Sequence, residues 1–427
     1  MSQVKVSHHP RSNGVPASWA WSLLAFAFLA EIVLGVGRNL GVAVSFSIVS
    51  GILCSISIVY VVFSSSAKSL SAVIAEDRSA VGMMLILSIL IVQALTSNQL
   101  VELTYFLRGL FLFFAFAILG RLTPNNDPIT ARKWALRMLG LFLTLILLHA
   151  VMGIGGVETA GGKERPGFTS FFYRGNQVAV VATLLYLYVM GTAKSGFFCS
   201  ATYFLGLGSM LLFNSVSGFI ALFLCGLLLL PRNFKWLLSL SSVALIFFTL
   251  ASNEFQSVGA GFFQSSRVAD ALSDFRTKGA LEGFLTLYGQ RGLSVSSAMA
   301  CLAERDVISM LLGASKHVIE ACVASSSPLA LNARAVENDL VELLATIGLA
   351  GAVITFAEFL PATATIWKQV LTTTTPKDYC RQTLTYALMG LAGLLFAATT
   401  GHTFTSPLSA SLLGLAIGRH RALLEKR

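Results

Sequence analysis

The stretch "RAVENDLVELLATIGLAGAV", residues 334–353, joins three acidic side chains to an apolar run with no further charge. The acids Glu337, Asp339 and Glu342 lie within six positions near its start. An apolar run of about 17 to 25 residues can cross the roughly 30 Å hydrocarbon core of a bilayer as a helix. This stretch therefore predicts a membrane-spanning helix near 339–360 with carboxylates at its entrance.

Apolar runs of this kind recur along nearly the whole chain of 427 residues, which is 55% hydrophobic and only 12% charged. Soluble domains carry about 25% charged residues, and the runs do not alternate with a period of two, as the strands of a membrane barrel would. The expected fold is all-α, a polytopic integral membrane protein with about twelve transmembrane helices. We expect these helices near residues 17–35, 40–64, 79–97, 103–120, 135–154, 176–193, 198–213, 217–230, 236–251, 339–360, 382–400 and 403–418.

The distribution of basic residues predicts the orientation, because Lys and Arg gather in short cytoplasmic loops. With a cytoplasmic N-terminus, 18 of the 30 basic residues fall in inner segments and five in short outer loops. The other seven lie in one long loop, to which the rule does not apply. We therefore expect a multi-pass protein of the bacterial inner membrane with both termini in the cytoplasm. The net charge of +10 reflects this bias and an attraction to membrane lipids, so it predicts no nucleic-acid partner.

The predicted spans divide the chain into three parts. Residues 1–251 hold nine spans and a short outer loop at 155–175, residues 252–337 form a large outer loop, and residues 338–427 hold three more spans. A loop as long as the large one is expected to fold. We expect amphipathic helices on the membrane surface there, one of them in "VSSAMACLAERDVISMLLG" (295–313). This large periplasmic loop favours chemistry or binding at the outer face.

The cysteines and histidines give few constraints. Cys301 and Cys322 fall in the large outer loop, where an oxidising compartment permits a disulfide. Both lie on apolar stretches, however, so the sequence leaves their pairing open. No Cys or His cluster has the spacing of metal ligands, and no metal or other cofactor is expected. The inner loops lack a glycine-rich phosphate motif, which argues against ATP chemistry in the cytoplasm.

The predicted outer face is rich in arginine. Arg165 and Arg174 lie in the short loop, and Arg267 and Arg291 lie in the long one. Arginine offers a planar fork of donors that suits phosphate oxygens, so several together could bind pyrophosphate. Each alone could equally be a solvated side chain at the level of the lipid headgroups. His402, in "TTGHTFTSP", could donate to a phosphate, act as an acid or base, or bond its own turn.

The acids of the opening stretch divide into two kinds. Asp339 is predicted to be the N-cap of the helix, with Glu342 as its capping-box partner, since both lie where the helix dipole favours negative charge. Glu337 precedes the cap and gains less from it. Glu337 is therefore the acid most free to act as a base.

Taken with the outer loop and the arginines, "ENDLVELLATIGLAGAV" gives the chain a family likeness. The chain resembles the O-antigen ligase and polymerase superfamily, membrane glycosyltransferases of bacterial surface polysaccharide assembly. That family has a motif of the form H-N-x-x-x-x-x-x-x-x-x-G after its large periplasmic loop. Asn338 matches the asparagine and Gly348 the glycine, whereas Glu337 stands in place of the histidine.

Shorter motifs extend the resemblance over roughly residues 165–418. Arg174 and Asn176 are similar to the family's arginine-containing approach to an asparagine that opens a span. "GQRGLS", with Arg291, is similar to an arginine site in the long loop, and the Gly-His turn at His402 is similar to one near the family's C-terminus.

The resemblance implies a GT-C-like fold and transfer of a glycan, with inversion and without a metal, from an undecaprenyl-pyrophosphate carrier at the periplasmic face. The acceptor would be a hydroxyl of a saccharide or of lipid A-core, and a flippase and a chain-length regulator would be partners. Glu337 would accept the proton of the acceptor hydroxyl. The residues implied to bind pyrophosphate or glycan are Arg174, Arg267, Arg291, Arg165, Asn176, Asn338 and His402.

Glu337 favours a polymerase that joins lipid-linked repeat units, since the family's ligases have histidine at this place. An O-antigen ligase that transfers the chain to lipid A-core is the first alternative, and protein O-glycosylation is another. A flippase for lipid-linked sugars is the alternative from a different class. It would need a central polar cavity, yet charges deep in the predicted spans are scarce, Glu31 and Arg108 being the clearest.

Overall fold

The structure of the chain is a computed structural model. It describes residues 18–39, 52, 55–56, 77–97, 109–122, 128–152, 159–160, 163–164, 171–172, 175–213, 215–231, 276–279, 290–314, 316–326, 338–371, 378–399 and 403–425. This part of the chain is almost entirely helical, as the sequence predicts. The strands described within it are β1 (Thr159–Ala160) and β2 (Lys163–Glu164), which pair antiparallel.

The helices follow one another along the chain with few long connections inside the described part. Their bounds are α1 (Ser18–Asn39), α4 (Arg78–Ser97), α6 (Leu110–Leu122), α7 (Pro128–Met152), α8 (Gly175–Gly191), α9 (Gly196–Leu212), α10 (Val216–Leu229), α15 (Gln290–Ala303), α16 (Val307–Leu312), α17 (Lys316–Ser326), α18 (Asp339–Ala357), α19 (Leu360–Leu371), α20 (Asp378–Thr399) and α21 (Pro407–Glu425).

Five of the described helices are long and apolar enough to cross a membrane, namely α1, α4, α7, α18 and α20. Four more, α6, α8, α9 and α10, are shorter but also apolar. The structure thus has the helices of a polytopic membrane protein, as the sequence predicts. The predicted spans near 40–64 and 236–251 lie almost wholly outside the described residues, so the total of twelve stays a prediction.

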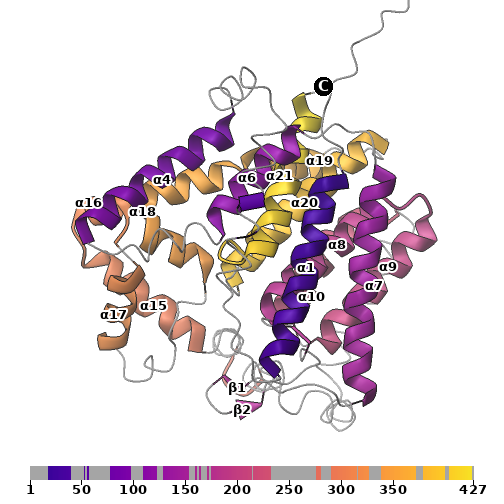
Figure 1. Cartoon of the computed structure of the whole chain (residues 1–427), viewed down its shortest axis with the longest axis horizontal. Coiled ribbons are helices and arrows are strands. Elements are labelled where there is room, and N and C mark those ends of the chain that lie inside the picture. The colour runs from indigo at the N-terminus through magenta and orange to yellow at the C-terminus, as the bar shows by residue number, and fades with distance from the viewer. Residues whose placement is uncertain are drawn as a thin grey trace, which may run out of the picture.

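Helices α6 and α21 run side by side in the middle of the bundle, with α20 and α8 packed beside α21 (Figure 1). Gly414 and Gly418 of α21 lie directly against the backbone of Phe113 and Ala117 of α6. Small residues permit this close approach, which drives helix association in membranes through packing. Helices α7 and α9 lie on one flank of the bundle, and α4, α16 and α18 lie on the other (Figure 1).

Buried ion pairs join the helix ends at one end of the bundle. Arg121, at the end of α6, pairs with Asp77 at the start of α4, with 2.9 Å between nitrogen and oxygen. Arg421 of α21 pairs with the carboxylate of Glu358, which follows α18, and donates to the hydroxyl of Ser79 at 2.7 Å. Asp77 and Glu358 are each only 1% exposed. A buried charge needs such partners to offset its lost hydration, so the network fixes these helix ends relative to one another.

Two helices differ from the prediction at this end. Helix α21 continues to Glu425 instead of ending near residue 418, and Glu425 pairs with Arg121 at 2.9 Å. Helix α19 occupies a stretch predicted to be an inner loop. Its threonines indicated a loop, but Thr363 and Thr365 donate to the carbonyl oxygens of Leu360 and Pro361 in their own helix, at 3.0 and 2.9 Å.

Candidate functional site

The first turn of α18 is capped by Asn338, so the prediction that Asp339 is the N-cap is wrong. The Asn338 side-chain oxygen accepts from the backbone N–H groups of Leu340 at 3.0 Å and Val341 at 3.2 Å. Its amide nitrogen donates to the carbonyl oxygen of Ala398, in the last turn of α20, at 2.7 Å. One side chain therefore satisfies groups at the ends of two helices, as helix termini require.

Asp339 has a different role from capping its own helix. Its carboxylate accepts hydrogen bonds from the backbone N–H groups of Thr403 and Phe404, the second at 2.9 Å. Asp339 and Thr403 are both 0% exposed. Hydrogen bonds to a charged acceptor are stronger than neutral ones. Asp339 thus anchors the connection between α20 and α21 to the start of α18.

The anchored connection is also held by aromatic packing. The ring of Phe404 lies 5.4 Å from that of Phe113 in α6 and 5.9 Å from that of Phe359, between ring centroids. Beside it, the hydroxyl groups of Thr403 and Ser406 are buried without a hydrogen-bond partner. Buried polar atoms are normally paired, so these hydroxyls are free to bond a water or a hydroxyl of a bound glycan.

These contacts bring together the two segments that carry Glu337 and His402. Both residues lie outside the described part of the chain, but Glu337 is the covalent neighbour of Asn338 and His402 that of Thr403. Segments some 64 positions apart in sequence, at Asp339 and Thr403, therefore meet at one place. The suggested roles of Glu337 and His402 stay predictions.

The predicted arginine set is described only in part. Arg165, Arg174 and Arg267 lie outside the described residues. Arg291 lies in the first turn of α15 and Asn176 in the first turn of α8, but the positions of their side chains are not described. Convergence of the arginines on a pyrophosphate therefore stays a prediction.

Helix α18 breaks at Gly348, the glycine of the motif. This residue has φ +66° and ψ −174°, a combination that is essentially restricted to glycine. A break in a membrane helix leaves carbonyl groups that need new donors. The oxygen of Ala345 accepts from the N–H of Ala314 at 2.8 Å, and that of Thr346 accepts from the side chain of Gln93 at 2.8 Å. The predicted single span near 339–360 is therefore two helical arms.

Gln93 is the residue at this break that the sequence reasoning missed. It comes from α4, is 8% exposed, and also donates to the carbonyl oxygen of Leu312 at 2.6 Å. Its amide therefore joins three helices, α4, α16 and α18. A single polar residue inside the apolar run 78–97 was the available signal, since polar groups within membrane helices are rare and usually bonded.

Replacing Gly348 with alanine is expected to destabilise the protein by about 1–3 kcal/mol from backbone strain alone. The added methyl group would also overlap the backbone of Gly313 and Leu311, which increases the loss. Thermal unfolding in detergent, followed by size-exclusion chromatography, measures the effect. Gly208→Ala in α9 is the matched control, because a methyl group there meets open space. Equal melting temperatures for the two variants would contradict the account of the break.

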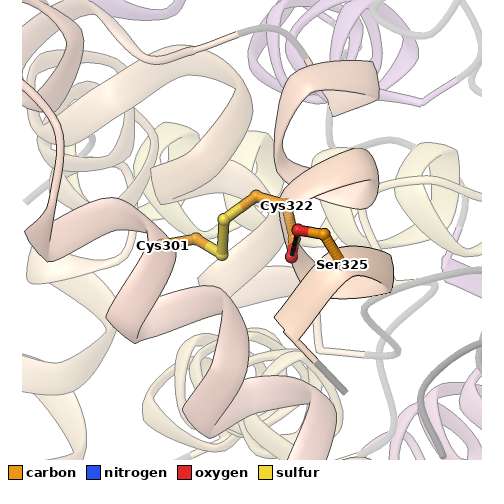
Figure 2. Close-up of a disulfide and its surroundings, with 3 residues drawn as sticks. All are labelled: Cys301, Cys322 and Ser325. Atoms are coloured by element: carbon orange, nitrogen blue, oxygen red, sulfur yellow. Dashed lines mark hydrogen bonds between the residues drawn. A yellow bond between two sulfur atoms is a disulfide. The ribbon is translucent and has the colours of Figure 1, made fainter. Parts of the chain in front are cut away.

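A disulfide holds two helices of the predicted outer loop together. Figure 2 shows Cys301 of α15 bonded to Cys322 of α17, which answers the question that the sequence left open. The hydroxyl of Ser325 donates to the carbonyl oxygen of Cys322 at 2.8 Å. The bridged pair shares a small apolar core with the first arm of α18. This core consists of Ala298, Cys301, Leu302, Ile319, Val323, Val341 and Ala345.

Metal chemistry has no visible site in the described part of the chain, where no three His, Cys, Asp or Glu residues form a group that could hold an ion. The prediction of a metal-independent reaction is not tested by this observation. Comparison with known proteins finds no family model that matches the chain and no curated protein that matches its sequence. Any function must therefore be argued from the residues and contacts of the chain itself.

Proposed function

We propose that the protein is a membrane glycosyltransferase of bacterial surface polysaccharide assembly, a polymerase that extends an O-antigen or exopolysaccharide. It would transfer a glycan from an undecaprenyl-pyrophosphate carrier to a sugar hydroxyl at the periplasmic face. The proposal includes the GT-C-like arrangement of about twelve spans expected from the sequence. It also includes the bacterial inner membrane and cytoplasmic termini.

The observation that carries the proposal is the contact between the start of α18 and the connection after α20. The two motif segments of the family resemblance meet there through Asn338 and Asp339. A reaction of two large substrates needs its groups held in fixed geometry. Buried, charge-assisted hydrogen bonds between distant segments supply such rigidity, and the unpartnered hydroxyls of Thr403 and Ser406 supply polar groups beside it.

The proposed reaction is a displacement at the anomeric carbon of the donor glycan. The acceptor oxygen forms a bond to this carbon while the bond from carbon to the pyrophosphate oxygen breaks, which inverts the configuration. The acceptor proton passes to the carboxylate of Glu337. The electron pair leaves with the carrier pyrophosphate, and fixed cations would stabilise the developing charge. The residues proposed for this role are Arg174, Arg267 and Arg291, with Arg165 and His402 beside them.

Two features support the proposed orientation. The disulfide between Cys301 and Cys322 is typical of an oxidising compartment, which favours a periplasmic position for α15 and α17. The opposite ends of the helices carry the arginine network of Arg121 and Arg421, as cytoplasmic ends usually do. The disulfide-bridged pair packs on the arm of α18 that begins at the proposed site, so both would face the periplasm.

The groove between α4 and α18, with a volume of about 350 Å³, does not favour a flippase. It is lined mainly by apolar side chains such as Val81, Leu85 and Val353, with Arg78 and Glu358 at one end. A pathway for sugars needs many polar groups. A ligase stays the alternative within the same chemistry, distinguished by its acceptor.

Deletion of the gene in its host tests the proposal, with gel analysis of surface polysaccharide. We expect single repeat units in place of long chains, and restoration of the chains by the wild-type gene on a plasmid. Full-length chains that remain on undecaprenyl pyrophosphate would indicate a ligase instead. Unchanged polysaccharide would refute both, and lipid-linked units trapped on the cytoplasmic side would indicate a flippase.

A further inference from the structure

Helix α16 is a short apolar helix that the rest of the described chain leaves uncovered. None of its residues is buried. Val307 and Ile308 are 70% and 69% exposed, and Met310 and Leu311 are 48% and 46% exposed. Contiguous exposed apolar surface of this kind usually marks a contact with a membrane or a partner.

The position of α16 shows which of these covers it. Its end docks at the break of α18, where Gly313 lies against Gly348, and the carbonyl oxygen of Leu312 accepts from Gln93 of α4. Gln93 lies four positions before the end of α4 at Ser97, or about 6 Å at 1.5 Å per residue. Helix α16 therefore lies beside the last turns of a helix that is long and apolar enough to cross the membrane.

The helices next to α16 continue the same uncovered apolar surface. Figure 1 shows α4, α16 and α18 together on one flank of the bundle. Large apolar side chains on a membrane-spanning helix are exposed where they face lipid. The exposed ones near the docked end of α16 are Ile91, Val92 and Leu95 of α4 and Leu349 and Val353 of α18.

A charged turn, Glu304–Asp306, precedes the apolar helix. Asp306 caps α16, accepting from the N–H and the hydroxyl of Ser309, both at 2.9 Å. These hydrogen bonds lower the pKa of the exposed Asp306 carboxyl, which keeps it ionised at neutral pH. A six-residue helix is about 9 Å long, which is less than one leaflet of a hydrocarbon core about 30 Å thick.

We infer that α16 is inserted into the hydrocarbon of one bilayer leaflet, the leaflet at the end of α4 near Ser97, with the turn Glu304–Asp306 at the headgroups. Its partner is lipid acyl chains, not a second protein. The sequence predicts one amphipathic helix on the membrane surface over 295–313. The chain instead folds as α15 and a separate apolar α16, because Asp306 caps a new helix. This inference does not depend on the proposed enzymatic activity.

Fluorescence quenching tests the inserted position. A single cysteine at Ile308 would carry an environment-sensitive nitrobenzoxadiazole label, with Glu304→Cys as the headgroup control and Val353→Cys as the lipid-facing control. The protein would be reconstituted in vesicles of phosphatidylglycerol and phosphatidylcholine, with or without bromine in the middle of the acyl chains. The intact disulfide is kept, and alanine replaces the other cysteines, Cys54, Cys199, Cys225 and Cys380.

We expect brominated lipid to quench the label at Ile308 as strongly as that at Val353, and several-fold more strongly than that at Glu304. Aqueous iodide should give the reverse order. Strong quenching of Ile308 by iodide would overturn the inference, because the helix would then lie in water. Protection from both quenchers would also overturn it, because a second protein would cover the helix. Met310→Cys, at 48% exposure, repeats the test if the first variant does not fold.

Discussion

Replacing Asp339 with alanine is expected to reduce polysaccharide chain extension by at least about 100-fold, the effect that a misplacement of about 1 Å can have on a reaction. The substitution removes the acceptor of the buried N–H groups of Thr403 and Phe404. Each N–H left without a partner costs about 1–3 kcal/mol, so the connection that leads to His402 should lose its position. Chain length on gels of the complemented deletion strain, at matched protein levels, measures the loss.

Asparagine at this position separates the charge from the geometry. Asp339→Asn keeps one acceptor oxygen and should retain more activity than the alanine variant. Asp306→Ala is the matched control, because it removes an acid that also accepts backbone hydrogen bonds but lies exposed at the start of α16. Full activity of Asp339→Ala would show that the anchor does not serve the reaction.

Replacing Arg421 with leucine is expected to destabilise the protein by about 3–5 kcal/mol, the usual cost of leaving a buried charge without its partner. Glu358 is 1% exposed, and Arg421 pairs with its carboxylate and bonds Ser79 as well. The melting temperature in detergent should fall by several degrees. Because the network joins α4, α18 and α21, unfolding should also become less cooperative.

The second partner gives the decisive control. Leucine at both Arg421 and Glu358 removes the unpaired charge, so the double variant should recover most of the lost stability. Arg78→Leu should cost less than about 1 kcal/mol, because its side chain is 52% exposed and its nitrogen lies 3.9 Å from Glu358. A double variant less stable than Arg421→Leu would contradict this view of the network.

The long helices were predictable because an apolar run of sufficient length can satisfy its backbone only as a helix in a membrane. The cap of α18 was not, since Asn338 and Asp339 are adjacent and both residue types cap helices equally well. The choice depends on Ala398 and Thr403, which lie about 60 positions further along the chain. No local pattern carries that information.

Other features depended on contacts between distant segments. The break of α18 needs both Gly348 and its partner Gly313, and the sequence indicated only a glycine that matched a motif. The pairing of Cys301 with Cys322 depends on how α15 and α17 pack, which their apolar sequences do not reveal. The separate helix α16 had a local signal that was missed, an aspartate, Asp306, three positions before a serine whose N–H it accepts.

The most direct test of the proposed polymerase uses the purified protein in lipid vesicles with undecaprenyl-pyrophosphate-linked repeat units from its host. We predict that a ladder of longer glycans forms on the carrier, that undecaprenyl pyrophosphate is released, and that a metal chelator has no effect. Glu337→Gln should abolish the ladder while the donor lipid still binds. Absence of chain extension by the wild-type protein, with intact repeat units and no released carrier, would contradict the central claim.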